Sequence, residues 1–148
     1  MQKIVFKPIG VIHTTLKYGE RGPIQPRYAK DIEGTIELAP EYIPALKDLD
    51  GFSHITLIYF MHKSKDFSLQ VVPYLDDKLR GLFSTRAPRR PNPIGLSVVR
   101  LIKIEQNILY IKEIDALNGT PLLDIKPFIA EFTNRDEIKM GWIDGKIS

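Results

Sequence analysis

The stretch LSVVRLIKIEQNILYIKEI, residues 96–114, predicts a β-hairpin and gives the clearest indication of the fold. Apolar and polar residues alternate in both halves, which is the period of a strand with one buried face. The polar triplet Glu105-Gln106-Asn107 separates the two halves and predicts the turn between them. We therefore expect antiparallel strands over Leu96–Ile104 and Ile108–Ile114.

Shorter segments on the N-terminal side of this hairpin also have strand character. An edge strand is expected over Ile4–Ile12, where Pro8 interrupts a β-branched run. Ile32–Leu38 alternates with period two and predicts a half-buried strand, whereas the apolar run Ile55–Phe60 predicts a central one. The remaining expected elements are a short strand at Leu69–Val72, a helix over Pro40–Leu49 and a helical turn or two over Arg135–Gly141.

Many short strands and few helices predict a mainly β, barrel-like fold with one or two short helices. We expect one domain over residues 1–148, with no C-terminal extension, because this length suits a single domain. The sequence has no G-x-G-x-x-G fingerprint, no Walker loop and no G-x-S-x-G elbow. A Rossmann fold, nucleotide hydrolysis and α/β-hydrolase chemistry therefore lose their usual support.

The composition is that of an ordinary globular protein, with 43% hydrophobic and 26% charged residues. The absence of cysteine excludes disulfides, thiolate metal sites and cysteine nucleophiles. The three histidines, His13, His54 and His62, lack the spacing of metal ligands, so we expect no metal. No apolar run approaches the length of a membrane span, and the first ten residues lack a signal-peptide core. We expect a cytoplasmic protein without a membrane partner.

Basic residues are concentrated between Lys78 and Ile104, where seven occur without any acid. They are Lys78, Arg80, Arg86, Arg89, Arg90, Arg100 and Lys103. Of the 21 basic residues in the chain, 14 remain outside this block, against 18 acidic ones. Clustered guanidinium groups repel one another unless an anion neutralises them, so the block indicates an anionic partner. The alternative is a solvated loop whose charges pair with acids elsewhere in the chain.

The basic block contains GLFSTRAPRRPNPIG, residues 81–95, with three prolines in six positions. Proline fixes its own φ and pushes the preceding residue into extended backbone, so Ala87, Arg90 and Asn92 are expected in a rigid segment. Rigid arginines and an asparagine suit a binding site, because little entropy is lost when they bind. A stiff crossover between two barrel strands is the alternative interpretation.

Asn118-Gly119-Thr120-Pro121 predicts a turn, because Asn and Gly tolerate positive φ. The turn leads to Asp124 and Lys126, which would share one face of an extended segment. Their two side chains could form a buried catalytic or orienting pair, or an ordinary surface ion pair.

Three motifs occur in order along the chain: Gly51-Phe52-Ser53-His54, Arg90-Pro91-Asn92-Pro93-Ile94-Gly95 and Asp124-Ile125-Lys126-Pro127. Together with Gly10-Val11-Ile12, Pro26-Arg27, His62-Lys63, Arg86 and Asp115, they resemble the TsaA/YaeB-like family, whose characterised members are TrmO-type tRNA methyltransferases. The resemblance covers about Ile9 to Phe128. It implies a small β-barrel that binds S-adenosyl-L-methionine without a Rossmann sheet and works as a homodimer. The reaction it implies is methyl transfer to N6 of a threonylcarbamoyl-modified adenosine beside the tRNA anticodon.

The resemblance also implies which residues contact the cofactor. They are Pro26, Arg27 and Tyr28 in the predicted loop Leu16–Lys30, His62 and Lys63 at a strand end, Arg86, and Ala116, Leu117, Asn118 and Gly119 in the predicted turn. A loop as long as Leu16–Lys30 is usually functional and would suit a cofactor lid. Two of these residues depart from the pattern of the family. Asn118 occupies the position before Gly-Thr-Pro where the family often has aspartate, and Tyr28 occupies the position after Pro-Arg where the family commonly has glutamine.

The remaining candidates follow from the chemistry of the reaction. A sulfonium methyl donor is already activated, so the protein needs alignment and a polar group at the accepting nitrogen more than a strong nucleophile. Asn92, Asp124 and Lys126 are the candidates for substrate positioning and proton handling, and Arg89 and Arg90 for contacts to RNA phosphates. Two alternatives stay open: a non-catalytic RNA-binding barrel, and a methyltransferase or S-adenosylmethionine-binding protein that acts on a small molecule.

Overall fold

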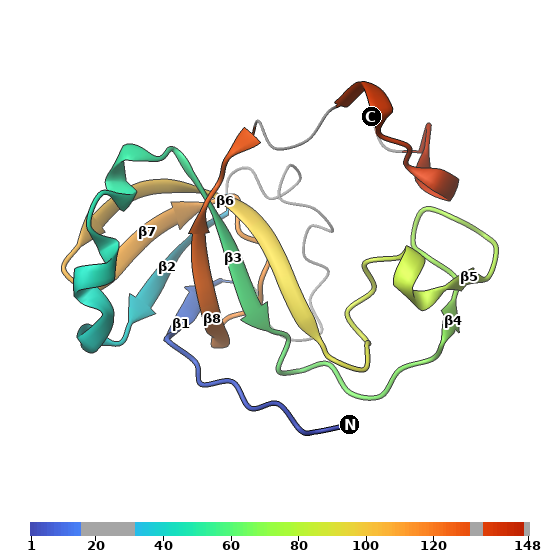
Figure 1. The fold of residues 1–148 in the computed structure, drawn as a ribbon, viewed down its shortest axis with the longest axis horizontal. Coiled ribbons are helices and arrows are strands. Elements are labelled where there is room, and N and C mark those ends of the chain that lie inside the picture. The colour runs from blue at the N-terminus through green and yellow to red at the C-terminus, as the bar shows by residue number, and fades with distance from the viewer. Residues whose placement is uncertain (16–31, 131–134, 147–148) are drawn as a thin grey trace.

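The computed structural model describes residues 1–15, 32–130 and 135–146. Six strands close an antiparallel barrel (Figure 1), which confirms the predicted mainly β fold. They are β1 (Gly10–Thr14), β2 (Glu33–Leu38), β3 (His54–Phe60), β6 (Ile94–Glu105), β7 (Ile108–Lys112) and β8 (Thr120–Pro127). Around the barrel they follow the order β1-β2-β7-β6-β3-β8, and β8 pairs with β1 to close it.

The predicted hairpin is confirmed as β6 and β7, and it joins the two halves of the barrel. β6 pairs with β3 through its first half and with β7 through its second half. A register shift between Leu101 and Lys103 lies where the second pairing begins, and an irregularity of this kind bends a strand. Gln106, with φ of 54°, makes the tight turn, and the carbonyl of Asn107 accepts the backbone N–H of Leu38 at 2.9 Å.

Alternate side chains point into the barrel and fill it. In β3, Ile55, Leu57 and Tyr59 are buried, whereas the residues between them are half-buried. The other strands add buried apolar side chains in the same way: Ile12, Ile36, Val99, Leu109, Ile111 and Leu122. Each such side chain stabilises the fold by ~1.5–3 kcal/mol through burial. Because apolar groups fill the interior, the polar chemistry is left to the ends of the barrel and its loops.

Two predicted elements differ from the structure. The N-terminal strand begins at Gly10 rather than Ile4, and residues 1–8 are exposed. Pro8 has no N–H to donate to a neighbouring strand, and only Gly10–Thr14 pairs with β2. The predicted helix over Pro40–Leu49 is a 3-10 helix, η2 (Pro40–Leu46), followed by η3 (Leu49–Gly51). Pro44 lies inside η2 and lacks the N–H that an α-helix would use there.

Residues 61–93 leave the barrel between β3 and β6 and form a lobe beside it (Figure 1). The predicted strand at Leu69–Val72 is present in the lobe as the two-residue β4 (Gln70–Val71), paired with β5 (Arg80–Gly81) and followed by the 3-10 turn η4 (Leu82–Ser84). The predicted C-terminal helical turns are η6 (Arg135–Glu137) and η7 (Gly141–Ile143). η7 attaches to the lobe, because Trp142 Nε1 donates to the carbonyl of Ser84 at 2.8 Å.

In the described parts of the chain, no helix is long and apolar enough to cross a membrane. The same residues contain no cluster of histidine and acidic side chains that could hold a metal ion. The predicted loop Leu16–Lys30, and with it Pro26, Arg27 and Tyr28, lies outside the described residues.

Candidate functional site

Several of the candidate residues lie at one end of the barrel. β3 ends at Phe60, which pairs with Ile94 at the start of β6. Beyond this pair, the backbone N–H of Met61 donates to the carbonyl of Pro93 at 2.8 Å. His62 and Asn92 therefore leave the barrel side by side, one after β3 and the other before β6.

The predicted turn after β7 reaches the same end of the barrel. Glu113 adopts a φ of 67° where β7 ends, and Asp115 then accepts a hydrogen bond at Oδ1 from Ser97 Oγ at 2.7 Å. On its other side the turn contacts the end of β1. The backbone N–H of Thr14 donates to Asn118 Oδ1 at 3.0 Å, and Thr14 Oγ1 donates to the carbonyl of Ala116 at 3.0 Å. A carboxylate at position 118 could accept the same N–H, so asparagine preserves this contact.

The turn is also held from within. Thr120 Oγ1 donates to the carbonyl of Leu117 at 2.7 Å, and the backbone N–H of Gly119 donates to the carbonyl of Ile12 at 2.8 Å. Gly119 has a φ of 84°, a left-handed conformation that favours glycine. Residues 115–119 are thus fixed against β1 and β6, as a preformed binding loop requires.

A buried polar network that the sequence interpretation missed lies beneath this loop. Tyr59 Oη and Ser97 Oγ are 2.7 Å apart, and both side chains are almost fully buried. Because the Ser97 proton is used toward Asp115, the Tyr59 hydroxyl is the donor to Ser97. Burial, followed by the charge of Asp115, raises the pKa of Tyr59 to about 12, and burial raises the pKa of Asp115. Ser97 and Tyr59 gave no sequence signal of a site, whereas Asp115 directly precedes the predicted turn.

His62 carries an unsatisfied polar atom at the same end. Its Nδ1 is buried and has no hydrogen-bond partner in the described part of the chain. Burial and the charge of neighbouring Lys63 lower the pKa of His62, so the imidazole is neutral at pH 7. A buried nitrogen without a partner is uncommon in native proteins and suits a group that accepts a ligand.

The arginine-rich segment divides its guanidinium groups between structure and solvent. Arg90 Nη1 donates to the carbonyls of Thr85 at 2.8 Å and Ala87 at 3.1 Å, and its guanidinium lies 5.8 Å from the centre of the Phe83 ring. Arg90 therefore stabilises the loop that contains it by bonding to the backbone of residues 85 and 87. Arg86, Arg89 and Asn92 are exposed, so among these candidates they are the ones that face solvent.

Asp124 and Lys126 lie apart from this group, on β8. Lys126 pairs with Thr56, four residues along β3 from Phe60, and Asp124 pairs with Ile58, two residues from Phe60; these separations correspond to ~13 Å and ~7 Å along the strand. Their side chains form an ion pair of 2.9 Å on the outer face of the barrel, with 46% of Asp124 and 61% of Lys126 exposed. The structure does not bring this pair to Asn92, and its role in substrate positioning stays a prediction.

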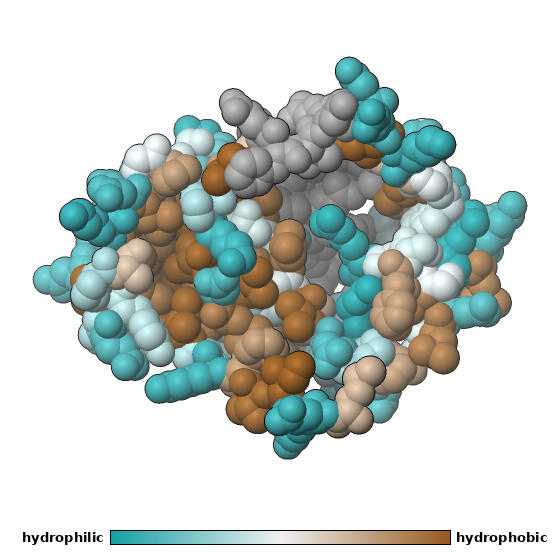
Figure 2. All heavy atoms as spheres, viewed as in Figure 1, coloured by the Kyte–Doolittle hydropathy of each residue, from teal (hydrophilic) through white to brown (hydrophobic). Residues whose placement is uncertain are grey.

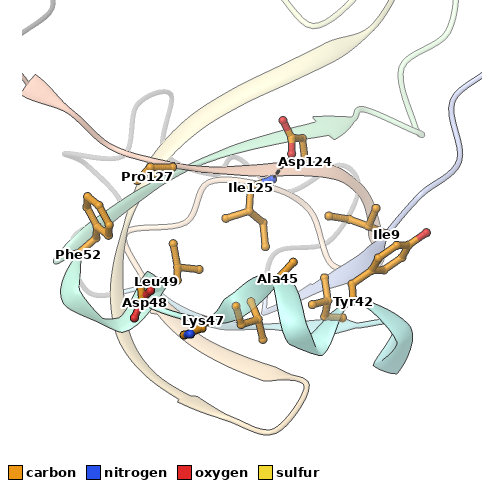
Figure 3. A pocket seen from close by; sticks show the side chains of 12 residues that line it. Ile9, Tyr42, Ala45, Lys47, Asp48, Leu49, Phe52, Asp124, Ile125 and Pro127 are labelled. Carbon is orange, nitrogen blue, oxygen red and sulfur yellow. Dashed lines mark hydrogen bonds between the residues drawn. The ribbon is translucent and has the colours of Figure 1, made fainter.

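A cavity of about 420 Å³ lies between η2 and β8, toward the opposite end of the barrel (Figure 3). Its lining is mostly apolar, with Ile125 and Leu49 directed into it and the Asp124 carboxylate directed away. Asp124 is the one candidate residue in its lining, so this cavity is separate from the site described above.

Residues 11–134 match the family model described as the tRNA-methyltransferase O N-terminal domain. The chain belongs to this family. A probable S-adenosyl-L-methionine-binding protein of Pyrococcus abyssi is 51% identical over 144 residues, which are 97% of this chain and 78% of the relative. The human tRNA (adenine(37)-N6)-methyltransferase is 34% identical over 144 residues, which are 91% of this chain and 32% of the human protein.

The solved structures of the family have the same fold. TrmO from Pseudomonas aeruginosa superposes with a TM-score of 0.78 and 35% identity, covering 97% of this chain and 64% of that protein. The TrmO family thus matches almost the whole chain, while the chain spans about two-thirds of the bacterial protein and one-third of the human one.

Proposed function

We propose that this protein is an S-adenosyl-L-methionine-dependent tRNA methyltransferase that acts on N6 of the adenosine beside the anticodon, with the threonylcarbamoyl-modified base as its target. The observation that carries the proposal is the position of His62, Asn92 and residues 115–119 at one end of the barrel. The relatives named as S-adenosylmethionine-binding proteins and as tRNA methyltransferases support it. Because tRNA is the substrate, the protein would act in the cytoplasm.

The residues present fit the proposed cofactor. S-Adenosylmethionine carries a carboxylate, an ammonium, a sulfonium and an adenine whose nitrogens form hydrogen bonds. The candidate residues include the exposed cations Lys63 and Arg86, the half-buried carboxylate of Asp115 and the unpartnered Nδ1 of His62. Ala116, Leu117, Asn118 and Gly119 add backbone groups in a fixed loop. When bound, the cofactor supplies a methyl group that its sulfonium sulfur already activates.

The residues toward the RNA follow from exposure and charge. Arg89 is exposed next to the rigid Pro91-Asn92-Pro93 segment, where its guanidinium can reach a phosphate. Asn92 is exposed between two prolines, and its backbone carbonyl accepts the N–H of Ile94 at 2.7 Å, which fixes the turn. Its uncharged amide suits the orientation of the base that receives the methyl group. Arg90 supports both by closing the loop beneath them.

We propose in addition that two copies of the chain form an isologous homodimer. Large apolar side chains are exposed on the N-terminal segment and on the lobe, among them Val5 at 82%, Tyr74 at 80% and Phe83 at 79%. Figure 2 shows apolar side chains at the lower edge of the face, where the N-terminal segment runs in Figure 1. Exposed apolar patches of this kind mark interaction surfaces. Light scattering at micromolar concentration is expected to give twice the mass of the chain, and a monomer that binds cofactor fully would contradict the dimer.

Calorimetry tests the proposed function in two steps. Binding of S-adenosylmethionine separates both methyltransferase alternatives from a non-catalytic RNA-binding barrel, and binding of bulk tRNA then separates an RNA substrate from a small molecule. Arg86→Ala is expected to weaken cofactor binding by ~1.5–3 kcal/mol, the range for a lost charge-assisted hydrogen bond. Arg100→Ala is the matched control, because Arg100 is an exposed arginine of the same basic block that lies on β6, where it pairs with His54, six residues along β3 from Phe60. Equal affinity of the two variants would remove Arg86 from the site.

A further inference from the structure

We propose that Asp115 supplies the negative charge that holds the cationic sulfonium side of the cofactor, and that Ser97 and Tyr59 fix its carboxylate for this purpose. The inference rests on the proposed function, because it concerns how that cofactor is held. It assigns a role to three residues that neither the motifs nor the relatives identify as cofactor contacts.

The carboxylate is fixed by a chain of hydroxyl groups. Ser97 Oγ donates to Asp115 Oδ1 at 2.7 Å, and the Tyr59 hydroxyl lies 2.7 Å from the same Ser97 oxygen. Ser97 is 3% exposed and Tyr59 is 6% exposed, so water does not compete for the hydrogen bonds of these hydroxyl groups. Ser97 lies on β6 and Tyr59 on β3, and together they tie the start of the 115–119 loop to the barrel. The orientation of the carboxylate is therefore set before any ligand binds.

Asp115 is an acidic residue among the basic residues of the site. The segments 59–63, 86–97 and 115–119 contain the basic residues Lys63, Arg86, Arg89 and Arg90, and Asp115 is the one acid among them. S-Adenosylmethionine carries two positive groups and one negative group. Basic side chains alone would attract its carboxylate but repel its sulfonium and ammonium, since like charges at short range disfavour binding. Asp115 provides the opposite charge where the segments meet.

The described part of the protein supplies no positive charge that would compensate the Asp115 carboxylate. Asp115 forms no ion pair with a cationic side chain in the described parts of the chain, although the Ser97 hydroxyl donates a hydrogen bond to it. Removing part of the water around a carboxylate without supplying a cation is costly, and the pKa of Asp115 rises in consequence. An amide would accept the Ser97 hydrogen bond equally well without that cost. A bound cation would compensate the charge, and its attraction is stronger in a partly buried site than in water.

The test compares two ligands that differ in one charge. S-Adenosylhomocysteine keeps the ammonium and carboxylate of S-adenosylmethionine, but its sulfur is neutral. Asp115→Asn is expected to lower the affinity for S-adenosylmethionine about tenfold or more and that for S-adenosylhomocysteine by a smaller factor. Calorimetry gives the two dissociation constants, and a change in their ratio measures how much the Asp115 charge contributes to binding the positive sulfur. Without ligand, Asp115→Asn is expected to unfold at or above the wild-type temperature, because the amide oxygen still accepts from Ser97 and the uncompensated charge is removed.

Two further variants separate charge from shape. Ser97→Ala loosens the carboxylate but keeps its charge, so it is expected to weaken both ligands by similar factors. Asp115→Glu also keeps the charge and is expected to retain the wild-type ratio, which tests the proposal even if Asp115→Asn fails to fold. Equal losses for both ligands in Asp115→Asn, unchanged affinities there, or a lost preference in Asp115→Glu would overturn the assignment of Asp115. A wild-type protein that binds neither ligand would overturn the proposed function itself.

Discussion

Gly95 and Tyr59 face each other across the β3–β6 pair, and the Tyr59 ring occupies the space that a Cβ atom at position 95 would need. The absence of a side chain at Gly95 thus lets the ring lie flat against the strand, with its hydroxyl reaching Ser97 two residues further along. The glycine of the Arg-Pro-Asn-Pro-Ile-Gly motif is in this way part of the network that holds Asp115.

We expect Gly95→Ala to destabilise the protein by ~1–3 kcal/mol, the usual cost of overpacking a buried site, because the Tyr59 ring must move. Urea unfolding measures this difference. Gly81→Ala is the matched control, since a Cβ at Gly81 would meet open space and its φ of −59° is compatible with alanine. Equal stability of the two variants would show that the Tyr59 ring is not held against Gly95.

Asn92→Ala is expected to lower the single-turnover rate of methyl transfer by about 10²-fold or more, as for other lost transition-state hydrogen-bond donors. The affinity for tRNA is expected to stay close to wild type, because Asn92 carries no charge. Rapid-quench kinetics at saturating tRNA and cofactor measures the rate. If the variant methylates at the wild-type rate, Asn92 has a structural role in the proline-rich turn and no role in catalysis.

Arg89 and Arg90 are expected to behave differently although they are adjacent. Arg89→Glu, at an exposed position, is expected to weaken tRNA binding and to reduce its salt dependence by about 0.7–0.9 in log–log slope per lost phosphate contact. Cofactor affinity is expected to be unchanged. Arg90→Ala removes the two hydrogen bonds from Nη1 to the carbonyls of Thr85 and Ala87, so its main expected effect is a less stable loop. An Arg89 variant with the wild-type salt slope would exclude this arginine from the RNA contact.

The attachment of the C-terminal turns to the lobe is expected to depend on pH through Asp76. Its carboxylate accepts hydrogen bonds from Lys146 Nζ at 2.8 Å and Arg80 Nε at 2.6 Å, which hold the pKa of this group well below its usual value. Because the pKa of Asp76 is lower in the folded protein than in the unfolded chain, the ionised carboxylate stabilises the folded state at every pH above the ordinary value of 3.8. As the pH falls below 3.8 toward the pKa of the folded state, this stabilisation is progressively lost.

The single tryptophan, Trp142, reports this attachment because its Nε1 donates to Ser84. Acidification below about pH 3.8 is expected to shift Trp142 emission to longer wavelength, and Asp76→Asn is expected to show that shift at neutral pH. Asp77→Asn, at an exposed neighbouring position, is the control. Wild-type emission in Asp76→Asn would mean that Asp76 does not hold the tail.

The barrel strands were predictable because their signals are local. Period two in Ile32–Leu38, the apolar run Ile55–Phe60 and the Glu105-Gln106-Asn107 turn each specify one element without knowledge of its neighbours. The errors also have local causes. Pro44 makes the predicted helix a 3-10 helix, and residues before Gly10 look strand-like although the barrel needs no pairing there.

The candidate site was only partly predictable, because its geometry depends on register. The motifs predict His62, Asn92 and residues 116–119 as site residues, and β3–β6 pairing brings the first two together. The Tyr59–Ser97–Asp115 network joins residues 38 and 18 positions apart, so no sequence spacing reveals it. Asp124 and Lys126 share a strand face, as the sequence predicts, and they form an ion pair on the outer side of β8, so their role in substrate positioning stays a prediction.

The most direct test of the account is transfer of an isotopically labelled methyl group from S-adenosylmethionine to tRNA, followed by digestion and mass spectrometry of the nucleosides. We predict that the wild-type protein places the label on N6 of threonylcarbamoyl-adenosine, and that tRNA lacking the threonylcarbamoyl group stays unlabelled. Label on unmodified adenosine at the same rate would contradict the proposed target. A protein that binds S-adenosylmethionine and tRNA but labels no nucleoside would contradict the proposal that it is a tRNA methyltransferase.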